Sequence, residues 1–148
     1  MTSPDIHPPQ RPVTYLLLPP GERHPEIAHL APFQAVVIVD AEVDSHWQNA
    51  TSAWLVRSGC LYMMAWGREC SSWDDSVDWA YIDDCPGEAT PDHRLVVTTW
   101  HEKESLKETF WFSKRCAIHP TVDLKNTLLL HIAVESQETK LLKIYANA

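Results

Sequence analysis

The alternation of short apolar runs with helix-like segments most constrains how this chain can fold. Apolar runs at residues 35–39 and 60–65 have the continuous pattern of strands that are covered on both faces. Residues 95–99 and 127–133 repeat this pattern, and helix-like segments separate the four runs. Because crossover helices cover both faces of a parallel sheet, the sequence predicts an α/β fold. We expect a three-layer sandwich with a mainly parallel sheet of four or five strands and three main helices.

Capping residues and apolar spacing indicate where the helices lie. Ser45 and Gln48 have the spacing of a capping box, and Ser105 and Glu108 repeat it. Residues 141–145 fit either a last edge strand or a short helix. The three main helices are expected over residues 45–58, 72–82 and 105–120.

The composition restricts the class of protein. With 148 residues, of which 45% are hydrophobic, the chain can bury one sizeable core. No apolar stretch approaches the roughly 20 residues of a membrane span, and the chain does not begin with a secretory signal pattern. We therefore expect a cytoplasmic protein that does not contact membranes. The four cysteines lie far apart, which favours reduced thiols.

Prolines divide the chain into two parts. Eight of the eleven prolines fall within residues 1–32, where they remove backbone donors and favour extended conformations. This segment is predicted to be a proline-rich N-terminal arm, and its apolar residues 13–18 suit an edge strand. Residues 33–148 are predicted to form a single α/β domain.

Negative charge is concentrated in the middle of the chain. Residues 33–104 hold thirteen acidic and four basic side chains, a net charge of −9, although the whole chain has a net charge of −8. Such a segment repels the phosphate backbone of nucleic acids, so direct nucleic-acid binding is not expected. A basic surface on another protein, or a hard divalent cation, fits this charge better.

A parallel sheet would bring the acidic segments together. The turns that start at Asp40, Gly67, Trp100 and Ala133 would all leave from the carboxyl edge of the sheet, where ligands usually bind. Tryptophan rings at this edge would offer a large contact area, unless they pack beneath the loops instead. The predicted binding residues are Asp40, Asp44, Trp66, Arg68, Cys70, Ser71, Asp74, Asp75, Trp100, His101 and Glu102.

Two kinds of chemistry are possible at this edge, and the residues of each could instead have a purely structural role. Asp74 and Asp75 either stabilise the start of a helix or join Asp40 around a divalent cation. Cys70 is either structural or a nucleophile with His101 as its base, although nearby carboxylates would raise the pKa of the thiol. His131, within an apolar run, is interpreted as a core histidine with a hydrogen-bond partner.

Several motifs are absent from the sequence. With four scattered glycines the chain has no glycine-rich phosphate loop, and it has no Cys-x-x-Cys or His-Glu-x-x-His motif, so no cofactor is predicted. One hypothesis is a non-catalytic protein-binding module, such as an inhibitor, immunity protein or accessory subunit, that docks a basic partner. The alternative is a small cytoplasmic enzyme that uses Asp40, Cys70 and His101. It would perform metal-assisted phosphoester hydrolysis or cysteine-dependent acyl chemistry.

Overall fold

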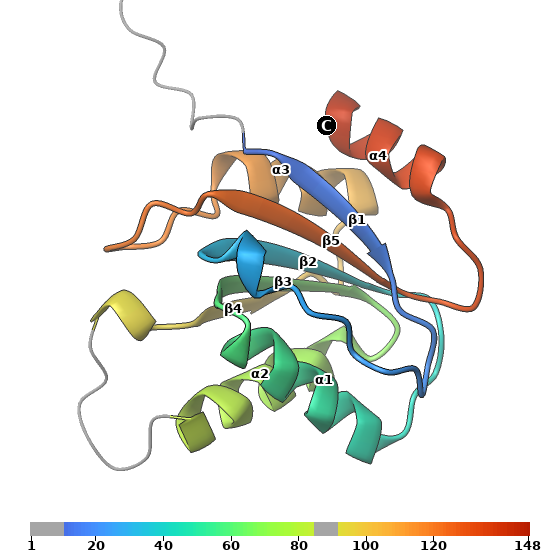
Figure 1. Cartoon of the computed structure of the whole chain (residues 1–148). Coiled ribbons are helices and arrows are strands. Elements are labelled where there is room, and N and C mark those ends of the chain that lie inside the picture. Colours follow the sequence, from blue (N-terminus) through green and yellow to red (C-terminus); the bar gives the residue numbers. More distant parts are fainter. Residues whose placement is uncertain (1–10, 85–91) are drawn as a thin grey trace, which may run out of the picture.

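The fold is built on one parallel sheet (Figure 1). The computed structural model describes residues 11–84 and 92–148. Across the sheet the strand order is β1-β5-β2-β3-β4, and every neighbouring pair is parallel. The strands are β1 (Val13–Leu17), β2 (Phe33–Val39), β3 (Cys60–Gly67), β4 (Val97–Trp100) and β5 (Asn126–Ile132).

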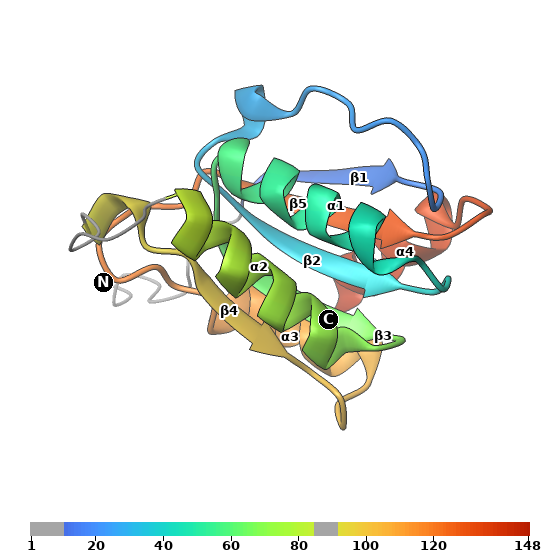
Figure 2. The same cartoon turned by 90° about the horizontal axis from the view of Figure 1, so that it is seen from below.

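Helices cover both faces of the sheet, so the predicted three-layer α/β sandwich is confirmed. Helices α1 and α2 pack on one face and α3 and α4 on the other (Figures 1 and 2). The fourth helix resolves the ambiguity at residues 141–145, because its apolar side buries Leu141 and Tyr145. The helices are α1 (Ser45–Arg57), α2 (Cys70–Asp84), α3 (Leu106–Arg115) and α4 (Glu138–Asn147).

The hydrophobic core lies in two layers, one on each side of the sheet. All seven residues of β2 are buried, which explains the continuous apolar run. Alternate residues of β2 face opposite ways: Val37 packs with the α1 and α2 layer, whereas Val36 and Ile38 pack with the α3 and α4 layer. None of the helices in the described residues is long and apolar enough to cross a bilayer.

The predicted N-terminal arm is part of the folded domain from residue 11 onward. Strand β1 pairs with β5 at one edge of the sheet. After β1, Leu18, Ile27 and Leu30 are buried in the core beneath α1. These apolar side chains integrate the segment in spite of its prolines, because they remove apolar surface from water. The remainder of the predicted arm, residues 1–10, lies outside the described residues.

The capping residue of α1 and the start of α2 differ from the sequence-based expectation, whereas the cap of α3 agrees. Helix α1 is capped by Asp44, not Ser45, since the Asp44 carboxylate accepts a 2.8 Å hydrogen bond from the Trp47 amide. The capping box of Ser105 and Glu108 at α3 is confirmed. Helix α2 begins at Cys70 instead of residue 72.

The early start of α2 follows from a tight turn after β3. Gly67 (φ +101°) and Glu69 (φ +52°) both adopt positive φ, which reverses the chain within two residues. A Cβ atom at Gly67 would lie 2.3 Å from the Val39 carbonyl oxygen, so only glycine fits there. As a result the first turn of α2 contains no acidic residue, and Asp74 and Asp75 lie in its second turn.

Candidate functional site

The carboxyl edge of the sheet is the candidate site, because the chain leaves β2, β3, β4 and β5 from this one edge (Figure 2). From the neighbouring strands β2 and β5, the chain continues to opposite faces, to α1 and to α4. In open α/β sheets such a divergence is the usual place of ligand binding.

A chain of hydrogen bonds crosses this point of divergence. The Asp40 carboxylate lies 2.6 Å from Nε2 of His131, and Nδ1 of the same ring lies 2.7 Å from the Tyr15 hydroxyl. The hydroxyl also accepts a 3.1 Å hydrogen bond from the Gln137 amide. A consistent assignment is that Nε2–H donates to the carboxylate while the Tyr15 hydroxyl donates to Nδ1. Every polar group of the buried ring then has a partner.

These hydrogen bonds hold the accessible carboxylate of Asp40 in a fixed orientation. The His131 side chain is 1% exposed, whereas that of Asp40 is 42% exposed. His131 is therefore a buried histidine with hydrogen-bond partners, as its place in an apolar run indicates, but it also positions Asp40. Tyr15 was not among the predicted site residues. Its apolar segment gives no sign of this contact, which depends on the pairing of β1 with β5.

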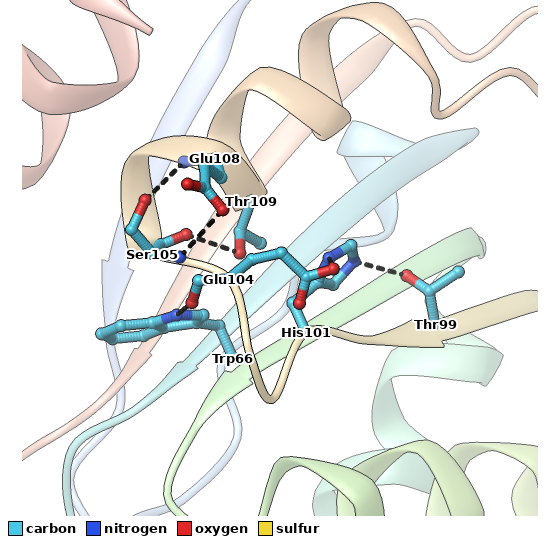
Figure 3. A network of polar contacts seen from close by, with 7 residues as sticks. All are labelled: Trp66, Thr99, His101, Glu104, Ser105, Glu108 and Thr109. Atoms are coloured by element: carbon cyan, nitrogen blue, oxygen red, sulfur yellow. Dashed lines mark hydrogen bonds and ion pairs between the residues drawn. The ribbon is translucent and has the colours of Figure 1, made fainter.

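A second polar network surrounds the exit of β4 (Figure 3). The ring of His101 lies 2.9 Å from the Thr99 hydroxyl and 3.8 Å from the Glu104 carboxylate. This ring also packs in a T-shaped arrangement against Phe112 of α3. His101 is 5% exposed, and burial lowers the pKa of its imidazole. The half-buried Trp66 donates from its indole nitrogen to the Glu104 carbonyl at 2.9 Å, which fixes the turn before α3.

The hydrogen bonds of the described residues do not join the Cys70 thiol to the His101 ring. Nε2 of the His101 ring lies 2.9 Å from the Thr99 hydroxyl, whereas the Cys70 thiol accepts a hydrogen bond from the His101 backbone amide. Cys70 is 3% exposed at the start of α2. Burial raises the pKa of its thiol, and the nearby Glu102 charge raises it further, although backbone amides partly oppose the shift. A buried thiol with a raised pKa is a poor nucleophile.

The aspartates proposed for a divalent cation are not brought together in the described residues. Asp40 lies at the exit of β2, Asp74 is buried against β4, and Asp75 is exposed on α2. Across residues 11–84 and 92–148, no three histidine, cysteine, aspartate or glutamate side chains are placed to hold a metal ion.

A different cluster forms where α2 packs against β4. The Thr98 hydroxyl donates to the Asp78 carboxylate at 2.7 Å, and it also lowers the pKa of Asp74. Burial has the larger effect, however, and raises the pKa of Asp74, with a further increase from the Asp78 and Asp75 charges. Asp74 is 6% exposed, and its Oδ1 atom has no hydrogen-bond partner in the described part of the chain.

Exposed carboxylates surround the carboxyl edge, and we call them the acidic rim. Arg68 and Lys103 are exposed basic residues in the same turns, and Ser71 is exposed at the start of α2. Two exposed apolar side chains accompany them, Trp100 at 50% and Val134 at 74%. The acidic rim consists of Asp40, Glu42, Asp44, Glu69, Glu102, Glu104 and Glu135.

These features define a three-layer α/β protein with an acidic carboxyl edge. The chain matches the family described as "Domain of unknown function (DUF7684)" over residues 13–148, and it belongs to that family. The match begins at β1, which agrees with the place of this strand in the domain. No curated protein and no solved structure matches the chain.

Proposed function

We propose that this protein is a non-catalytic protein-binding module of the cytoplasm that docks a basic surface of another protein on the acidic rim. An inhibitor, an immunity protein or an accessory subunit would act in this way. The observation that carries the proposal is the Asp40 carboxylate, which is accessible and held by the buried His131. An acceptor that is already ordered loses little conformational freedom when a lysine or arginine binds it.

The surroundings of Asp40 favour the same kind of partner. Like charges on the acidic rim attract a basic surface over several ångströms and accelerate its encounter. Trp100 and Val134 supply exposed apolar area at the same edge, and aromatic side chains are frequent anchors of protein interfaces. The same negative charge disfavours nucleic acid, whose phosphates it would repel.

The enzymatic alternative has weaker support. Cysteine-dependent chemistry would rely on a buried Cys70 thiol with a raised pKa, and the metal-assisted mechanism lacks an assembled set of ligands in the described residues. One observation favours an enzyme: Asp40 is placed by a hydrogen-bonded histidine at the point where β2 and β5 diverge. Hydrolysis of p-nitrophenyl phosphate or acetate by the wild type, lost in Asp40→Asn, would favour the enzyme over the binding module.

Affinity capture from the native source tests the binding module. Wild-type protein should recover a basic partner at low salt and lose it at high salt, because screening weakens contacts between exposed charges. Asp40→Asn should recover much less of this partner. Asp123→Asn is the matched control, since it removes the same charge from an exposed aspartate between α3 and β5, away from the rim. Equal recovery by the two variants, or no partner for the wild type, would overturn the proposal.

A further inference from the structure

The outer edge of β4 is open in the described part of the chain. Strand β4 is the last in the sheet and pairs only with β3 there (Figure 2). The His101 amide donates to the Ala65 carbonyl of β3 at 2.9 Å. Because backbone groups alternate in direction along a strand, Thr98 and Trp100 direct their N–H and C=O groups away from β3. These groups can pair with an added strand.

The side chains at this edge are suited to a cation. On the α2 side of β4, Thr98 contacts Asp78, while the buried Asp74 keeps one carboxylate oxygen without a partner in the described residues. A buried acceptor without a donor is destabilising, particularly when it carries a charge. An ammonium or guanidinium group would supply both the missing donor and the opposite charge.

We propose that an extended basic segment of the partner protein binds β4 as an added strand and directs a lysine or arginine side chain to Asp74 and Asp78. An apolar residue of the segment would pack on Trp100, which is 50% exposed two positions beyond Thr98. Strand addition to an open sheet edge combines backbone hydrogen bonds with side-chain selectivity. This inference rests on the proposed function and adds to it the binding mode and a second anchoring point.

The negative charge of α2 indicates which kind of segment can bind at the β4 edge. The helix holds five aspartates and no basic residue, so an acidic or phosphorylated segment would be repelled. A second copy of this chain would bring the same acidic helix and the same carboxylates to the contact. A basic segment instead complements the cluster, and its cation would stabilise the ionised form of Asp74.

The test uses the full chain labelled with ¹⁵N and a synthetic peptide in which arginine and valine lie two positions apart, with threonine between them. Both side chains then face the same side of the added strand, as Thr98 and Trp100 do on β4. We expect the Thr98 and Trp100 amides to shift on titration and to exchange more slowly with solvent. Asp74→Asn should weaken binding by about tenfold, the size expected for loss of a charge-assisted hydrogen bond. Asp75→Asn is the matched control, because it removes the same charge from an exposed neighbour on α2. The same peptide with glutamate in place of each arginine should not bind.

The remaining outcomes separate this inference from the proposed function. If Asp40→Asn weakens peptide binding while Asp74→Asn and Asp75→Asn behave alike, the partner binds the acidic rim only, and the β4 inference is overturned. If the arginine peptide produces no shifts at Thr98 and Trp100, the β4 inference is overturned, whereas the proposed function is overturned only if the capture experiment recovers no basic partner. Shifts at β4 that depend on protein concentration without peptide would identify a second copy as the occupant. If Asp74→Asn fails to fold, Asp78→Asn provides the same comparison, because it removes the charge of the second carboxylate that the proposed cation would contact.

Discussion

The two polar clusters of this protein differ in how completely they satisfy their hydrogen bonds. In the first, His131 lies between Tyr15 and Asp40, and one ring supplies a donor to the carboxylate and an acceptor to the hydroxyl. In the second, the single hydroxyl of Thr98 serves two carboxylates, those of Asp74 and Asp78. One proton cannot satisfy both acids. The first cluster is complete within the chain, whereas the second lacks a donor.

The two clusters also differ in where they lie in the sheet. The first cluster joins three neighbouring strands, β1, β5 and β2, and so contributes to the pairing of the sheet. The second lies at the edge strand β4, where an external strand has access. The comparison indicates that the first cluster mainly stabilises the fold and orients Asp40, and that the second keeps capacity for a ligand. Three substitutions test this difference.

The largest effect is expected from His131→Ala. It removes a ring that is 1% exposed, opens a cavity beneath α4 and deprives Tyr15 of its partner. The free energy of unfolding should fall by about 3 kcal/mol, as measured by urea denaturation. Asp40→Asn should cost less, because the ring stays in place. A loss below about 1 kcal/mol for His131→Ala would show that the first cluster does not stabilise the fold.

A smaller effect is expected from Tyr15→Phe. This change keeps the ring but removes the hydroxyl, so that Nδ1 of His131 and the Gln137 amide both lose a partner. We expect a loss of about 1 kcal/mol in thermal or urea unfolding, the usual size for one buried hydrogen bond. Since Asp40 would also be held less firmly, partner capture should decrease. If both stability and partner capture were unchanged, the hydrogen bonds from Tyr15 through His131 to Asp40 would neither stabilise the fold nor orient Asp40.

The smallest effect, with the opposite sign, is expected from Asp74→Asn. Burial raises the pKa of Asp74 above its ordinary value of 3.8, so the folded protein holds this proton more tightly than the unfolded chain does. The stability that this group contributes is therefore present below pH 3.8 and is lost as the pH rises through the raised pKa. Asparagine does not titrate, so the variant should gain stability relative to wild type as the pH rises.

Urea unfolding at several pH values between 4 and 8 measures this difference. The advantage of Asp74→Asn should grow with pH, whereas Asp75→Asn, on an exposed neighbour, should show little change. A variant that is less stable than wild type at neutral pH would mean that the ionised Asp74 already has a partner within the chain.

Local sequence patterns predicted much of the architecture. Continuous apolar runs at residues 35–39 and 60–65 correspond to the buried strands β2 and β3, because strands covered on both faces need apolar side chains throughout. The alternation with helices then implied parallel strands and a shared carboxyl edge for Asp40, Cys70 and His101. Details that depend on one or two backbone angles were not predictable, such as the start of α2 at Cys70.

Most element types, the three layers and the gathering of acidic turns at one edge were predictable from the amino-acid sequence, since these follow from periodicity and from the handedness of crossovers. The helix at residues 141–145 was not, because its short apolar pattern also fits a strand. Which side chains meet at this edge depends on how the strands pair. Tyr15 and His131 are 116 positions apart, and His131 and Asp40 are 91 positions apart. Their contacts exist because β5 inserts between β1 and β2, and the register of that pairing is a property of the whole sheet.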